Sequence, residues 1–247
     1  MDYSKISEIL TDRLKLEYNP VGFYYSKNLP ENSLTVGKNG NGCIAPLILQ
    51  SGKGKRVVFY ESHFGWQCSA YYLGYTDSIF PGIENYLSTV ELPQRGCERF
   101  IKTPAQAKAF VDEMRMLPPA KDFAVYKPLA DFKDDEEPEV IIFFCNPDQL
   151  SALIFLSHFS DPLDSSRVVT MFASACASVS CIPVKFSRSG EKKAVCGFHD
   201  ISARSRHKQD ILSISFTPEL FKEIAENLDD TFLFTDNWEK IRDRITA

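Results

Sequence analysis

Four cysteines form two matched pairs, Cys43 with Cys68 in the first half of the chain and Cys176 with Cys196 in the second. In each half the predicted order is a strand, a helical stretch, a second strand and a closing cysteine. Thiolates bind soft metals and are the usual ligands of iron–sulfur clusters. The pattern therefore predicts that Cys43, Cys68, Cys176 and Cys196 converge on an iron–sulfur cluster or another thiolate-bound metal.

The cysteines also permit a simpler interpretation. A free cysteine often serves as a small apolar residue of the core, and Ala175-Cys176-Ala177 is typical of helix packing. The chain has no Cys-x-x-Cys knuckle of the kind found in zinc and ferredoxin sites. Cys97 lies between Arg95 and Arg99, whose charges favour a reactive thiolate, whereas Glu98 opposes it.

An acid and a histidine accompany both closing cysteines. Glu61 and His63 come shortly before Cys68, and His199-Asp200 follows Cys196. A histidine near a carboxylate can act as a base or a metal ligand, although a surface or core role is the more common one for such residues.

Downstream, the segment from Arg204 to Lys208 is a basic cluster in an acidic protein. It is either a solvated loop or an anion pocket, because arginine offers a two-pronged donor to carboxylates and phosphates. The predicted ligand-binding residues are Arg204, Asp200, His199, Glu61 and His63.

Several elements that would position these residues can be placed. Thr103-Pro104, Asn146-Pro147 and Thr217-Pro218 each predict a helix start, with a capping residue before a proline. Val140–Phe144 is a continuous apolar run typical of a buried strand. The sequence also predicts short helices at Cys43–Gln50 and near Trp238–Ile245 and a helix at Arg167–Ser180. Strands are predicted at Val21–Tyr25, Arg56–Glu61, Asp122–Tyr126, Pro183–Arg188, Lys193–Cys196 and Ile211–Phe216.

Strands and helices intermix without strict alternation, which favours an α+β fold with a mixed sheet. The chain is predicted to be one domain, residues 1–247, made of two pseudo-repeated α/β halves at roughly 19–130 and 138–228. The acidic segment 131–138 would connect them. We expect the site between the halves, where clefts commonly bind ligands.

Composition narrows the function classes. The 247 residues carry a formal charge of -5, which argues against a nucleic-acid partner. No apolar run approaches the roughly 20 residues of a membrane span, and the N-terminus does not resemble a signal peptide. A cytoplasmic protein with reduced cysteines, a small-molecule or metal partner and no membrane partner is therefore expected. Oligomeric state is not indicated.

The chain resembles an uncharacterised archaeal and bacterial group, domain of unknown function family 169, from about Ile6 to Leu228. The segments that carry the resemblance are Asn19-Pro20-Val21, Cys43-Ile44-Ala45, Glu61, Cys68, Leu73-Gly74-Tyr75, Lys102-Thr103-Pro104, Tyr126-Lys127-Pro128-Leu129, Pro138-Glu139-Val140-Ile141, Asn146-Pro147-Asp148-Gln149, Ala175-Cys176-Ala177, Cys196 and Asp200-Ile201-Ser202-Ala203-Arg204.

The resemblance implies that the four cysteines are a shared feature, but it implies no reaction. Where relatives have two glycines after the cysteine matching Cys68, this chain has Ser69-Ala70-Tyr71-Tyr72. The sequence thus predicts a metal- or iron–sulfur-binding protein with four cysteine ligands between two halves. The alternative is a small-anion-binding protein or a non-metal enzyme that uses the His199–Lys208 region.

Overall fold

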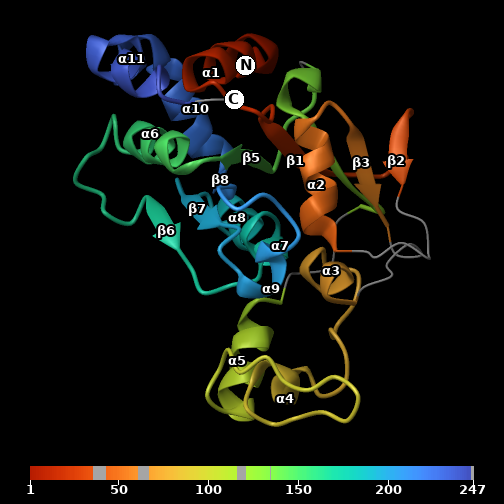
Figure 1. The fold of residues 1–247 in the computed structure, drawn as a ribbon. Coiled ribbons are helices and arrows are strands. Elements are labelled where there is room, and N and C mark those ends of the chain that lie inside the picture. Colours follow the sequence, from red (N-terminus) through yellow and green to blue (C-terminus); the bar gives the residue numbers. More distant parts are fainter. Residues whose placement is uncertain (36–42, 61–66, 116–120, 134, 246–247) are drawn as a thin grey trace.

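The computed structural model describes residues 1–35, 43–60, 67–115, 121–133 and 135–245. Within these ranges, eight strands form one mixed sheet in the order β2-β3-β4-β1-β5-β8-β7-β6 (Figure 1). The strands are β1 Val21–Ser26, β2 Ser33–Thr35, β3 Arg56–Phe59, β4 Phe123–Pro128, β5 Val140–Cys145, β6 Val168–Thr170, β7 Ala194–Gly197 and β8 Leu212–Phe216. The predicted α+β class and mixed sheet are therefore confirmed.

The first four strands occupy one side of the sheet and the last four the other. In the first set β4 pairs antiparallel with β1 and β3, and β2 pairs parallel with β3. In the second set β8 pairs antiparallel with β5 and β7, and β6 pairs parallel with β7. The two sets meet where β1 and β5 run antiparallel.

Helices cover both faces of the sheet, so β5 is buried on both sides. Successive strand residues point to opposite faces, and accordingly Ile142 and Phe144 belong to one core cluster while Ile141 and Phe143 belong to the other. The helices are α1 Tyr3–Leu14, α2 Ile44–Gly52, α3 Gln67–Tyr72, α4 Ile83–Leu87, α5 Pro104–Glu113, α6 Pro147–Ser157, α7 Ala175–Ser178, α8 Cys181–Arg188, α9 Ile201–Arg204, α10 Pro218–Glu226 and α11 Asp236–Arg242. Residues of α1, α6, α10 and α11 belong to the same core cluster as Ile141, and residues of α2, α3, α7 and α8 belong to the same core cluster as Ile142.

The three proline-marked helix starts are found as predicted. Thr103 caps α5, and Asn146 forms a reciprocal capping box with Gln149 at the start of α6. Pro218 occupies the first turn of α10. A proline there loses no helical hydrogen bond, because the first amides of a helix have no acceptor within it.

Two predicted elements in the second half are wrong. The helix expected at Arg167–Ser180 is instead strand β6 followed by the single turn α7, because Val168, Val169 and Thr170 are β-branched and favour a strand. The strand expected at Pro183–Arg188 is helix α8. Its proline lies in the first turn, where a helix tolerates it.

A long segment between α3 and β4 carries α4 and α5, and it projects beyond one end of the sheet (Figure 1). The acidic connector contributes Glu136, whose carboxylate pairs at 2.6 Å with the buried ammonium of Lys127. Among the described residues, no helix combines the length and apolar character needed to cross a membrane.

Candidate functional site

A cavity of about 810 Å³ lies beside the helices of the first core cluster, at the end of the sheet where α4 and α5 project. The first half contributes Cys43, Gln67, Cys68 and Tyr72, and the second half contributes Ser174, Ala175, Cys176, Asp200, Ser202, Ala203 and Arg206. The segment between α3 and β4 supplies the remaining wall: Ile79, Phe80, Ile83, Tyr86, Leu87, Arg95, Glu98 and Phe100.

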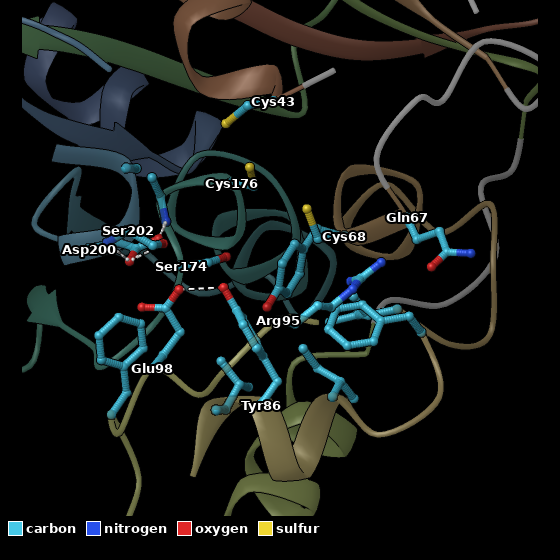
Figure 2. Close-up of a pocket in the computed structure, with 18 of the residues that line it drawn as sticks. Cys43, Gln67, Cys68, Tyr86, Arg95, Glu98, Ser174, Cys176, Asp200 and Ser202 are labelled. Atoms are coloured by element: carbon cyan, nitrogen blue, oxygen red, sulfur yellow. Dashed lines mark hydrogen bonds between the residues drawn. The ribbon is translucent and has the colours of Figure 1, made fainter. Parts of the chain in front are cut away.

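Three of the four predicted thiol ligands line this cavity. Figure 2 shows Cys43, Cys176 and Cys68 on one side of it, with Tyr86 and Glu98 rising from the α4 side. Cys43 is the residue before α2, Cys68 is the second residue of α3, and Cys176 is the second residue of α7. Three separate helix starts therefore bring their thiols to one space.

Cys43 carries the acidic thiol of the group. A side-chain hydrogen bond from Cys176 lowers the pKa of Cys43 to about 6, although burial opposes this shift. The Ala45 amide at the start of α2 and the Arg206 guanidinium also favour the charged sulfur. At neutral pH Cys43 is therefore mostly a thiolate.

The other two thiols remain protonated. The pKa of Cys176 is raised, first by its hydrogen bond to Cys43 and then by burial and by the negative charges of Cys43 and Cys68. Burial raises the pKa of Cys68, and the charge on Cys43 adds to it. The cavity thus holds one thiolate, one buried thiol that donates to it, and one further thiol nearby.

The fourth predicted ligand lies on the other side of the sheet. Cys196 is in β7, where Val195 belongs to the core cluster beside the cavity and Cys196 belongs to the opposite one. It is buried and pairs across the sheet with Ile214. The structure therefore brings three of the expected ligands together and separates Cys196 from them. Within the described ranges, no group of three or more His, Cys, Asp or Glu side chains is arranged to hold a metal ion.

Asp200 lies at the cavity and joins two helix starts. One carboxylate oxygen accepts from the Ser202 amide at 3.0 Å and hydroxyl at 2.8 Å, and the other accepts from the Ala175 amide at 3.1 Å. Its neighbour His199 instead contacts the Met171 carbonyl at 2.9 Å through Nε2 and does not line the cavity.

Arg204, the predicted anion contact, is engaged with the backbone. Its guanidinium donates to the carbonyls of Phe198 at 3.2 Å and Ile211 at 2.6 Å, and also to that of Gln209. The arginine that lines the cavity is Arg206, two residues further on. The remaining predicted ligand-binding residues, Glu61 and His63, lie outside the described residues.

Sequence reasoning missed the wall contributed by the segment around α4. Arg95 stacks on the ring of Phe80 with its guanidinium carbon 4.4 Å from the ring centre. The Tyr86 hydroxyl donates to the Glu98 carboxylate. Charge within Arg95-Gly96-Cys97-Glu98 was a usable signal, but Cys97, the reactive thiol it suggested, is not among the residues lining the cavity.

Tyr71 and Tyr72, which follow Cys68 in α3, have defined places in the structure. Tyr71 donates to the Val111 carbonyl at 2.7 Å and so ties α3 to α5. Tyr72 lines the cavity, is 4% exposed and hydrogen-bonds to Ser174, the residue before α7. The two tyrosines thus link α3 to α5 and to the residue before α7.

The family model of DUF169, described as "Uncharacterised ArCR", matches residues 9–227. No curated protein and no solved structure matches the chain.

Proposed function

This chain belongs to the DUF169 family, and we propose a function for it from its cavity: it binds a small anionic molecule with an apolar portion, in contact with the Cys43 thiolate. The single observation that carries the proposal is the composition of the cavity wall. A thiolate, two arginines and an aromatic surface line the same space.

The wall suits a ligand with both polar and apolar parts. Its volume, about 810 Å³, lies in the range of about 300–1,000 Å³ typical of small-molecule sites. Phe80, Phe100 and Ile83 offer apolar contact. Burial and the Glu98 carboxylate raise the pKa of Tyr86 to about 12, and the charges of Arg95 and Arg206 both oppose this rise, so the two guanidinium groups act on the same part of the cavity. Guanidinium groups bind carboxylates and phosphates strongly through paired hydrogen bonds.

Supporting this, we propose that the two predicted halves are related units with the site between them. Each set of four strands has the same order outward from the β1–β5 junction and the same pattern of parallel and antiparallel pairs. Helix α2 follows β2 as α7 follows β6, and α3 follows β3 as α9 follows β7. In this comparison the counterpart of Cys68 is Ser202, because each is the second residue of its helix.

Binding is tested by thermal unfolding in the presence of mono- and dicarboxylates and phosphorylated compounds. A ligand at a hundred times its Kd stabilises the folded state by about 2.7 kcal/mol. Arg95→Gln should abolish this gain. The matched control is Arg99→Gln, because Arg99 lies on the same segment, is largely exposed and does not line the cavity. If no anion stabilises the protein, or if both variants respond as the unmodified chain does, the proposal fails.

A second candidate is a soft metal ion or an iron–sulfur cluster bound by Cys43, Cys68 and Cys176. The observation that favours it is that these thiols come from three helix starts to one cavity. Within the described ranges they are not arranged to hold a metal ion, so binding would have to draw the three sulfurs closer together. A bound small molecule would supply the remaining coordination position. Protein purified without oxygen should then contain iron and sulfide, or bind zinc stoichiometrically, and Cys68→Ala should lose the metal. Three freely titratable thiols after incubation with metal would contradict this candidate.

A further inference from the structure

We propose that Cys43 and Cys176 are a redox-active pair that reduces a small disulfide bearing carboxylates, and that the pair forms a reversible disulfide between the two halves. This inference rests on the proposed function and deepens it, because it names the chemical class of the anion. In this proposal Cys43 attacks the substrate, Cys176 completes the reaction, and the arginines of the cavity bind the substrate's carboxylates.

The positions of the two sulfurs set the order of events. Cys43 is half-buried at the cavity wall, whereas Cys176 is only 6% exposed. A molecule that enters the cavity therefore meets Cys43 first. The Cys176 thiol donates a hydrogen bond to Cys43, so it is already adjacent to the sulfur that it must later attack.

Cys68 is the other thiol that could complete the reaction, and the contacts favour Cys176. Cys68 interacts with Cys43 through charge, but its side-chain hydrogen bond is to Ser69. The side chains of Cys176 and Cys43, by contrast, form a hydrogen bond with each other. Helices α2 and α7, which carry or directly follow these two cysteines, are also in contact.

The chemistry balances as two thiol–disulfide exchanges. The Cys43 thiolate attacks one sulfur of the substrate disulfide, that bond breaks, and one substrate thiolate leaves and takes up a proton. Cys176 then loses its proton and attacks the Cys43 sulfur of the mixed disulfide, which releases the second substrate thiol. Two electrons pass from the cysteines to the substrate, and the products are one protein disulfide and two small thiols.

The arginines select the substrate. Arg206 lies close enough to Cys43 to hydrogen-bond with it, and Arg95 lines the same cavity. A disulfide that carries carboxylates can pair with these guanidinium groups while its sulfur reaches Cys43, whereas a cationic disulfide cannot form these pairs.

The test incubates reduced, metal-free protein with oxidised glutathione, and with cystamine as the cationic probe, followed by intact mass and peptide mapping. We expect the unmodified chain to lose two hydrogens and to yield a Cys43–Cys176 peptide. Cys176→Ser and Cys176→Ala should stop with one glutathionyl group on Cys43, and Cys43→Ser should form neither product. Cys97→Ser is the matched control and should behave as the unmodified chain.

Rates complete the test. Oxidised glutathione should react about tenfold faster than cystamine, and Arg95→Gln should remove most of that preference. A protein that stops at the mixed disulfide, or that links Cys43 to Cys68, overturns the redox pair. If anions still stabilise the protein through Arg95 in that case, the proposed binding function stands. If no anion binds either, both proposals fail.

Discussion

At the scale of single residues, the chemistry of the site depends on which thiol holds the proton. Cys43 and Cys176 have the same side chain, but one sulfur accepts a hydrogen bond near an arginine and the other is buried and donates. Their pKa values therefore shift in opposite directions. Because of this difference in pKa, Cys43 is the nucleophile of the proposed reaction, and Cys176 stays protonated until the second step.

The first prediction concerns alkylation of Cys43 by iodoacetamide. Its rate should rise with pH through a midpoint near the pKa of about 6 and be nearly constant above pH 7.5, because the thiolate is the reacting form. Cys176→Ala removes the donor that favours the thiolate, so the midpoint should move upward. Mass spectrometry of the Cys43 peptide gives the rate, with the Cys97 peptide as internal reference. An unchanged midpoint in Cys176→Ala would contradict the assignment.

The second prediction separates Arg204 from Arg206. Arg204→Gln removes charged donors to three backbone carbonyls and should lower the free energy of unfolding by about 1–3 kcal/mol, as measured in urea. Arg206→Gln should instead raise the pKa of Cys43 and weaken anion binding, because its guanidinium lies at the thiolate. The reverse pattern, with anion binding lost only in the Arg204 variant, would favour the original sequence interpretation.

At the scale of elements, close packing holds the Cys176 helix in place. A Cβ on Gly197 of β7 would lie 2.1 Å from Oγ and 2.5 Å from Cβ of Ser178, the last residue of α7. Glycine at this position lets the helix approach the strand, and Asp200 anchors the start of the same helix through the Ala175 amide. The position of Cys176 therefore depends in part on Gly197 and Ser178, which do not line the cavity.

The third prediction follows from that packing. Gly197→Ala should displace α7, lower the free energy of unfolding by about 1–3 kcal/mol and slow alkylation of Cys43. Ser178→Gly removes the two closest atoms and leaves only Oγ of Ser213, at 2.9 Å, so the double variant should recover more stability than the sum of the single effects allows. A purely additive double variant would show that the contact between Gly197 and Ser178 does not set the position of the helix.

At the scale of the whole molecule, the sheet separates two sets of side chains. The cavity and its three thiols belong to one face, while Cys196 and Cys145 belong to the core of the other. The halves meet at β1 and β5, and the cavity forms where helix starts from both of them come together.

The fourth prediction tests this separation. Cys196→Ser should destabilise the protein by about 1–3 kcal/mol, because it buries a hydroxyl in an apolar core. It should leave the Cys43 alkylation rate and anion stabilisation unchanged, since the sheet lies between Cys196 and the cavity. Loss of either property at a temperature where the variant is folded would place Cys196 in the site.

Local sequence signals determined much of the framework. Threonine or asparagine before proline set the starts of α5, α6 and α10, and the apolar run Val140–Cys145 set the central strand. These signals succeed because capping and proline geometry act over a few residues. Two predictions failed: the helix at Arg167–Ser180, where the β-branched run Val168–Thr170 forms a strand, and the strand at Pro183–Arg188, where the proline lies in the first turn of a short helix.

By itself, the sequence determined the mixed α+β class, and it singled out Cys43, Cys68 and Cys176 as residues of interest. Only the tertiary structure decided that these three line one cavity and that Cys196 faces the other core. It also decided that Arg206, rather than Arg204, lines the cavity. The physical reason is that the face of a strand residue changes with each step along the chain, and that the partners of a side chain come from distant segments.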